Sequence, residues 1–213
     1  PFLAPVDPSA FRAEFRLPQD ALVIGMVAQM IPRKGHRYLF SALPGLVERY
    51  PELQVLVFGQ GPLLGELRSD VATRGLDSVV HFTGFRHDLA SWIGGLDMLA
   101  HPAEMEGLGV SLLQAAAAGV PVITSRAGGL PEAVQDGVTG ILCPPGDVDA
   151  LAAAIDRLAG DPALRRQYGE AGRQRVREVP HGRLAQRRDH DARARRRQGG
   201  HPQVVGQPLQ AID

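Results

Sequence analysis

The chain has 213 residues, of which 44% are hydrophobic and 22% are charged, and its 23 basic residues balance its 23 acidic residues. This composition excludes a wholly disordered chain and a fibrous repeat, and the length is sufficient to bury a core. The single cysteine, Cys143, excludes an internal disulfide, and no uninterrupted apolar run of about 18 residues could span a bilayer. We therefore expect a globular domain with a cytoplasmic location.

Short apolar runs alternate with segments of helical periodicity along the chain. The pattern predicts strands over 21–29, 53–58, 79–83, 97–101, 121–124 and 141–143. The helices predicted between and after them cover 36–50, 63–74, 88–93, 110–118 and 148–158. Pro44 is a candidate kink in the first of these helices, and Asp147 is the expected cap of the last. Such alternation is typical of a parallel sheet covered on both faces. The predicted fold class is α/β, with a doubly wound, Rossmann-like sheet.

The ends of the chain are expected to lie outside this domain. Residues 1–20 are interpreted as a leading segment or linker, and 21–179 as the Rossmann-like domain. Residues 181–213 hold seven arginines against three aspartates and no aromatic residue that could stack on bases. We therefore predict a disordered basic tail over 180–213 and no nucleic-acid partner. A reading-frame shift near residue 179 is a hypothesis for the change of composition.

Open parallel sheets bind ligands at the carboxyl ends of their strands. We therefore expect the functional residues to lie in the loops that follow the predicted strands. The loop 29–35 places Arg33 and Lys34 just before a helix, where free amides and the helix dipole also attract anions. A solvated basic turn is the alternative interpretation. The loop around Gly61 lacks the spacing of a dinucleotide fingerprint, so its glycines predict a tight turn with close backbone approach.

The loop 104–109 carries Glu106 directly before two glycines and a predicted helix. Free amides from Gly107 to Val110 could bind a phosphate, while the carboxylate accepts hydrogen bonds from hydroxyl groups. Gln114 follows about two helical turns later and can both donate and accept hydrogen bonds. An acid-rich helix start with a surface glutamine is the alternative.

Eight collinear motifs carry a resemblance to a known family. They are VDPSAF at 6–11, KG at 34–35, GQGP at 59–62, FTGF at 82–85, EGLGVSLLQA at 106–115, GVPV at 119–122, GGLPE at 128–132 and DGVTG at 136–140. Over about Val6 to Glu178 the sequence resembles the C-terminal, donor-binding domain of a family 4 retaining glycosyltransferase of the GT-B type. In such enzymes two Rossmann-like domains face each other across a cleft, and the second binds a nucleotide-activated sugar.

The resemblance implies roles for individual residues. Lys34 and Glu106 would be the catalytic pair, since Lys34 would bind the donor diphosphate and Glu106 the donor-sugar hydroxyls. Gln29 stands where the family usually has an arginine, and Gln114 where it usually has the second glutamate of a pair. The predicted nucleotide-binding residues are Gln29, Arg33, Gly61, Phe85, Arg86, Gly107, Leu108, Gly109, Val110 and Gln114.

The implied function is retaining hexosyl transfer from a UDP- or GDP-sugar to a glycan or lipid-linked acceptor, with no cofactor and no metal. The implied partners are the nucleotide-sugar donor and an acceptor-binding domain upstream. That domain could bring the protein to the inner face of a membrane, and without it we expect this chain to be inactive. A non-catalytic nucleotide-sugar or sugar-phosphate binding module is the alternative. His36, beside Lys34, is expected to be a surface histidine at the helix start, and contact with the ligand is the alternative.

Overall fold

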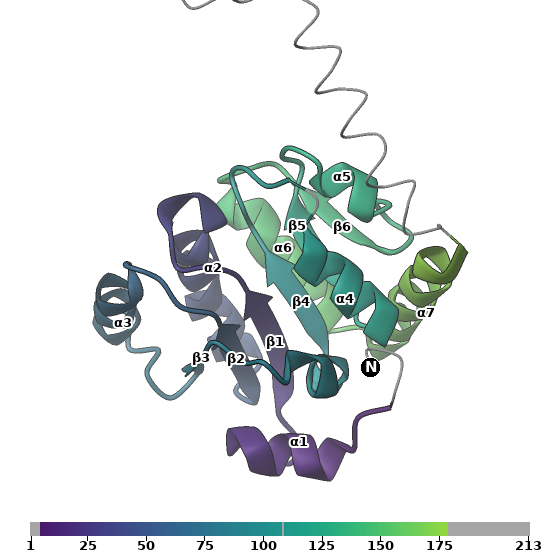
Figure 1. Cartoon of the computed structure of the whole chain (residues 1–213). Helices are drawn as coiled ribbons and strands as arrows, with labels where there is room; N and C mark the ends of the chain where they lie inside the picture. The colour runs from purple at the N-terminus through teal and green to yellow at the C-terminus, as the bar shows by residue number, and fades with distance from the viewer. Residues whose placement is uncertain (1–4, 108, 179–213) are drawn as a thin grey trace, which may run out of the picture. The chain divides into compact units, whose positions relative to one another are not determined.

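A single parallel sheet organises the domain. The computed structural model describes residues 5–107 and 109–178. Its six strands are β1 Leu22–Val27, β2 Leu53–Phe58, β3 Val80–Gly84, β4 Met98–His101, β5 Val122–Ser125 and β6 Gly140–Cys143. All pairings are parallel, and the order is β3-β2-β1-β4-β5-β6 (Figure 1). The first strand, β1, therefore lies in the middle of the sheet, with β2 and β3 on one side of it and β4, β5 and β6 on the other. This order confirms the doubly wound α/β prediction.

Helices cover both faces of this sheet. They are α1 Pro8–Phe15, α2 His36–Arg49, α3 Leu64–Thr73, α4 Val110–Ala118, α5 Leu130–Ala133, α6 Val148–Ala159 and α7 Pro162–Glu178. Successive side chains of β1 enter opposite cores, because Val23 packs with α1 and α4 whereas Ile24 packs with α2 and α6. Burial on both faces explains why the strands are almost continuously apolar. The predicted cap of α6 is confirmed, since the Asp147 carboxylate accepts the Ala150 N–H at 2.9 Å.

Residues 1–20, predicted to be a leading segment or linker, contain a helix. Helix α1 begins after Asp7, whose carboxylate accepts the Ser9 N–H at 2.9 Å, and a proline stands at its first position. Phe11 is fully buried, and the Phe15 ring meets Phe58 edge-on. The Asp-Pro-Ser sequence was therefore a helix-start signal, and α1 packs on the sheet as part of the described domain.

The predicted helix over 88–93 is wrong. Residues Leu89–Ser91 and Ile93–Gly95 form two short 3₁₀ turns instead. Gly94 and Gly95 disfavour helix, and a Cβ at Gly95 would lie 2.4 Å from the Phe11 ring. The segment therefore takes the conformation that lets α1 pack closely against it. By contrast, α2 continues through Pro44. The predictions for Leu108, for the tail 180–213 and for a frame shift near 179 lie outside the described residues.

Candidate functional site

The carboxyl ends of β1 and β4 bring two of the predicted loops together. After β1, residues Pro32–Lys34 form a 3₁₀ turn that ends at Gly35. Gly35 has a φ of 76°, and a Cβ there would lie 1.9 Å from the Pro102 carbonyl oxygen. The Glu104 N–H donates to the Arg33 carbonyl at 2.9 Å. Glycine is therefore required at position 35 for the loop 29–35 to pack against the loop that follows β4.

The contact between these loops joins the two residues predicted to be catalytic. The Lys34 ammonium forms an ion pair with Glu106 Oε2, and their side chains are only 11% and 18% exposed. The second carboxylate oxygen, Oε1, accepts the Gly107 N–H at 2.9 Å. His101 Nε2 lies 3.2 Å from Oε2. The structure thus places Lys34, Glu106 and Gly107 in one cluster and adds His101, a residue that was not predicted from the sequence.

The surroundings hold Glu106 in its charged form. The hydrogen bond with His101 is the largest cause that lowers the pKa of Glu106 well below its usual range, and Lys34 and the Gly107 N–H lower it further. Burial acts in the opposite direction. The carboxylate is therefore an acceptor at neutral pH, as binding of hydroxyl groups requires.

His36 differs from its expected surface position. Its side chain is only 2% exposed, and neither ring nitrogen has a hydrogen-bond partner in the described part of the chain. Burial is the main cause that lowers its pKa to about 4, and the charges of His101 and Lys34 add to the effect. The expectation of a surface histidine is wrong because Gly35 turns the start of α2 inward, so that the ring packs near Phe40.

A glycine in the GGLPE motif positions the loop of Glu106. Gly128 has a φ of 55°, and a Cβ there would lie 2.1 Å from the Glu106 carbonyl oxygen. The following Gly129 N–H donates to that oxygen at 3.2 Å. Gly109, with a φ of 62°, then leads into α4. Val110 is 61% exposed at the start of α4, and Gln114 lies half-buried one turn further along.

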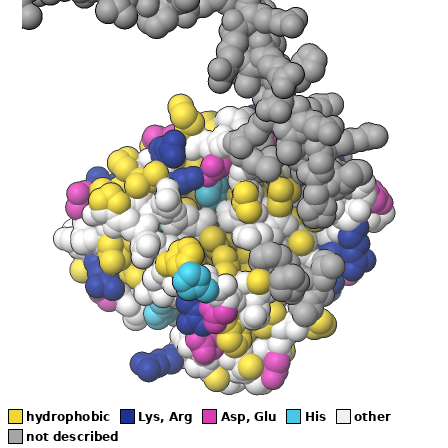
Figure 2. All heavy atoms as spheres, viewed as in Figure 1, with side chains coloured by type: hydrophobic (Ala, Val, Ile, Leu, Met, Phe, Trp, Pro, Cys, Tyr) yellow, Lys and Arg dark blue, Asp and Glu magenta, His cyan; other side chains and the backbone are white. Residues whose placement is uncertain are grey.

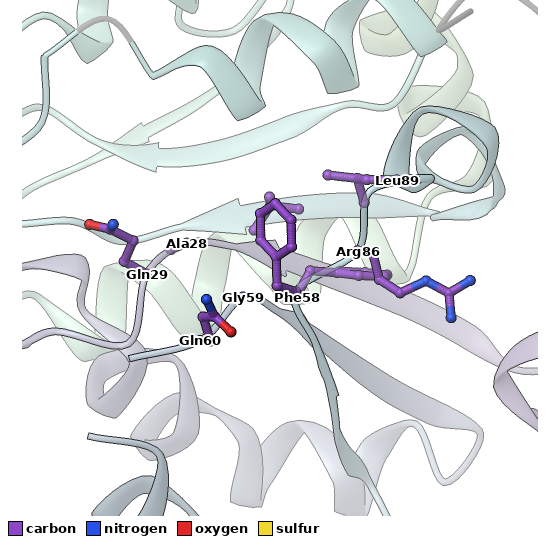
Figure 3. Close-up of a pocket in the computed structure, with 9 residues that line it drawn as sticks. Ala28, Gln29, Phe58, Gly59, Gln60, Arg86 and Leu89 are labelled. Carbon is purple, nitrogen blue, oxygen red and sulfur yellow. The ribbon is translucent and has the colours of Figure 1, made fainter. Parts of the chain in front are cut away.

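A cavity of about 290 Å³ lies beside the ends of β1, β2 and β3 (Figure 3). It is lined by Val27, Ala28, Gln29, Phe58, Gly59, Gln60, Phe85, Arg86 and Leu89. The lining combines apolar side chains with the amides of two glutamines, and Phe85 is 58% exposed. The predicted residues Gln29, Phe85 and Arg86 therefore meet at this cavity and are not among the contacts of the Lys34–Glu106 pair.

The guanidinium of Arg86 is engaged elsewhere. It donates to Glu14 at 2.8 Å and to Asp88 at 2.7 Å, and it lies 5.6 Å from the centre of the Phe15 ring. Figure 3 shows the side chain directed away from Gln29 and Gln60. In this structure Arg86 contributes to the cavity wall, while its charge is matched by two carboxylates.

The glycines after β2 allow close backbone approach, as predicted, and the partner is the loop after β1. A Cβ at Gly59 would lie 2.0 Å from the Ala28 carbonyl oxygen, and one at Gly61 would lie 2.5 Å from that of Met30. The Met30 N–H donates to the Gln60 carbonyl at 3.0 Å. Gly61 therefore supports the neighbouring loop 29–35. Arg33 is exposed on that loop.

Apolar side chains are exposed around the same edge of the sheet. Phe85, Met105 and Val110 are each more than half exposed. On the face viewed in Figure 2, hydrophobic side chains are interspersed with charged and histidine side chains.

Within residues 5–107 and 109–178, no three or more His, Cys, Asp or Glu side chains form a group that could hold a metal ion. Nor does this part of the chain contain a helix with the length and apolar character needed to cross a membrane.

The fold and the site define a Rossmann-like domain of the GT-B type. The family model described as glycosyl transferases group 1 matches residues 8–175. The chain belongs to this family, and the resemblance to the C-terminal domain of a GT-B glycosyltransferase is confirmed.

Two curated relatives illustrate the similarity. The GDP-mannose-dependent alpha-(1-6)-phosphatidylinositol monomannoside mannosyltransferase of Mycolicibacterium smegmatis is 37% identical over 163 residues, which cover 72% of this chain and 43% of the relative. The D-inositol 3-phosphate glycosyltransferase of Kribbella flavida is 36% identical over 79% of this chain and 42% of that protein. The chain thus spans less than half the length of these two relatives.

Solved structures agree with this assignment. Anabaena Alr3699/HepE in complex with UDP has a TM-score of 0.77 at 25% identity, over 90% of this chain and 53% of that chain. The C-terminal domain of a glycosyl transferase group 1 family protein (LpcC) from Francisella tularensis has a TM-score of 0.73 at 27% identity. That match covers 81% of this chain and 93% of the solved domain.

Proposed function

We propose that this chain is the donor-binding domain of a retaining, family 4 hexosyltransferase, which acts on a glycan or lipid-linked acceptor. The observation that carries the proposal is the Lys34–Glu106 pair, held at the carboxyl edge of the sheet next to the start of α4. A cation and free helix amides suit a diphosphate, and a charged carboxylate beside them suits sugar hydroxyls.

In the proposed mechanism Lys34 stabilises negative charge on the departing diphosphate. The amides at Gly109 and Val110 assist it, while the Gly107 N–H stays on the Glu106 carboxylate, and the exposed Arg33 adds charge on the same turn. Leu108, also predicted to bind the nucleotide, is not among the described residues. Glu106 accepts hydrogen bonds from donor-sugar hydroxyls and holds the ring in line for transfer with retention of anomeric configuration.

The nucleoside part of the donor fits the cavity beside β1, β2 and β3. A base could lie on its apolar wall, with Phe85 exposed at the rim and the amides of Gln29 and Gln60 as donors and acceptors. Gln114 on α4 would accept and donate hydrogen bonds at the ribose hydroxyls. Both a UDP-sugar and a GDP-sugar are candidates, because the relatives include GDP-mannose-dependent enzymes and a solved structure holds UDP.

Binding of a nucleoside diphosphate tests the proposal directly. We expect the chain 1–213 to bind UDP or GDP in a calorimetric titration, and to unfold at a higher temperature in the presence of the bound nucleotide. The bound diphosphate would bridge Lys34 and the start of α4. No heat and no thermal shift with either nucleotide at millimolar concentration would refute the proposed function.

A second expectation concerns catalysis. We expect the purified chain to transfer no sugar by itself, because the proposed reaction needs a second, acceptor-binding domain to close the cleft and exclude water. The measurement is product formation from radiolabelled UDP-glucose or GDP-mannose with a lipid or glycan acceptor. Robust transfer by the purified chain would contradict this expectation. The same second domain would provide any peripheral contact with the inner face of a membrane.

The second candidate is a binding module that performs no transfer. It is favoured by Gln29 and Gln114, neutral amides at the two positions where the resembling enzymes usually carry charge. A neutral hydrogen bond is weaker than a charge-assisted one by roughly 1 kcal/mol. Turnover of a nucleotide sugar by this chain joined to its acceptor-binding domain would distinguish the enzyme from the module.

A further inference from the structure

His101 is a buried histidine whose position is set by the sheet. It is the last residue of β4, its side chain is about 2% exposed, and it pairs with Thr124 of β5. The Thr124 hydroxyl donates to the His101 carbonyl at 2.8 Å. Strand pairing and this hydrogen bond both restrain the backbone from which the ring projects, so the ring is held at a defined place beside the loop of Glu106.

The ring presents a hydrogen-bond donor to the carboxylate. His101 Nε2 lies 3.2 Å from Glu106 Oε2, and an ionised carboxylate can only accept, so the proton belongs on Nε2. His101 Nδ1 is buried and has no hydrogen-bond partner in the described part of the chain. The hydrogen bond to Glu106 therefore runs through Nε2, and Nδ1 takes no part in it.

Lys34 and His101 contact the same oxygen of Glu106. In the ligand-free structure Oε2 is shared by the Lys34 ammonium and His101 Nε2, while Oε1 accepts the Gly107 N–H. A diphosphate that binds Lys34 competes with Glu106 for that ammonium. Among the contacts of the described residues, His101 and the Gly107 N–H would then remain on the carboxylate, with one donor on each oxygen.

We propose that His101 is a positioning residue, which holds the Glu106 carboxylate in the donor-sugar site while Lys34 binds the diphosphate. This inference rests on the proposed function. A carboxylate has about four lone-pair positions, so two donors from the protein leave acceptor capacity on both oxygens for sugar hydroxyls. His101 thus acts through Glu106 and touches no part of the donor.

Two substitutions distinguish the effect of losing the His101 N–H donor from the effect of losing the volume of the ring. His101→Phe keeps a planar ring and removes the N–H, whereas His101→Gln places an amide N–H near the position of Nε2. The chain 1–213 and both variants are titrated calorimetrically with UDP, GDP, UDP-glucose and GDP-mannose. We expect His101→Phe to weaken binding of the preferred nucleotide sugar about tenfold and to leave the affinity for its nucleoside diphosphate within about twofold. His101→Gln should recover most of the loss.

The outcomes distinguish this inference from the proposed function. If the unmodified chain binds neither nucleotides nor nucleotide sugars, the proposed function is refuted and the inference falls with it. If that chain binds them, unchanged nucleotide-sugar affinity in His101→Phe overturns the positioning role. An equal loss for the nucleoside diphosphate and the nucleotide sugar also overturns it, because such a loss indicates only a structural role.

A measurement without substitution covers the case in which the variants fail to fold. Nitrogen-15 NMR of the imidazole rings in the unmodified chain reports which ring nitrogen carries the proton. We expect the His101 proton on Nε2, and a bare Nε2 would overturn the inference.

Discussion

Replacement of Lys34 by alanine is expected to weaken binding of UDP or GDP by roughly 1–3 kcal/mol, the range of a hydrogen bond to a charged group. The Lys34 side chain is only 11% exposed and already pairs with Glu106, so its ammonium lies where little water screens its charge. The substitution removes the cation and leaves a carboxylate that repels the diphosphate. Calorimetric titration of both chains with the same nucleotide measures the difference.

Two matched variants control for a general loss of positive charge. Arg33→Ala removes an exposed cation from the same turn and should cause a smaller loss of affinity. Arg37→Ala removes an arginine that pairs with Glu66 on the protein surface, and it should leave nucleotide binding unchanged. An affinity that is the same in Lys34→Ala as in the unmodified chain would mean that the phosphates bind elsewhere.

His36 is expected to make the free energy of unfolding fall by about 3 kcal/mol between pH 6.5 and about pH 4, because its pKa decreases from 6.5 to about 4 on burial. In this window the unfolded chain takes up the proton first, so stability is lost as the pH falls. Below about pH 4 both states are protonated, and the contribution ends. Urea denaturation at a series of pH values, for the unmodified chain and for His36→Leu, measures this contribution.

The variant His36→Leu should show a correspondingly smaller loss of stability over the same window. His36→Gln is the matched variant, since it also cannot titrate but keeps a polar side chain at the buried position. Both variants should lack the pH-dependent contribution of His36 to the free energy of unfolding, although their stabilities at pH 7 will differ because the two side chains pack differently. Curves that run parallel to that of the unmodified chain from pH 7 to pH 4 would show that His36 does not titrate as its burial requires.

Local sequence patterns were sufficient for most of the elements. Strands buried on both faces must be apolar throughout, which made β2 and the residues of β1 recognisable, and α4 was predicted with its observed bounds. Loop residues at strand ends must meet at one edge of a parallel sheet, so Lys34 and Glu106 could be selected from separate loops. These predictions depend on periodicity and topology, which short stretches of sequence carry.

The contacts within the site were decided by tertiary structure. In the sequence, His101 is indistinguishable from the other residues of a buried strand. Only the pairing of β4 with β5 and the folding of the loop 104–109 over the end of β4 bring Glu106 Oε2 within 3.2 Å of His101 Nε2. Arg86 is predicted to bind the nucleotide, and only the folded chain shows that α1 supplies Glu14 and the following turn supplies Asp88 to its guanidinium. Hydrogen bonds and ion pairs depend on angstrom distances between residues far apart in the chain.

The class of fold could thus be predicted from the sequence alone, and the sequence also selected the edge of the sheet and the two charged residues that form the candidate site. How these residues are partnered, and which of their neighbours are buried, depends on the tertiary structure. Gly35 and Gly128 illustrate the reason, because a Cβ at either position would lie 1.9 to 2.1 Å from a carbonyl oxygen of another loop. Their sequence pattern indicates a turn, but the packing of loops that requires glycine there exists only in the folded chain.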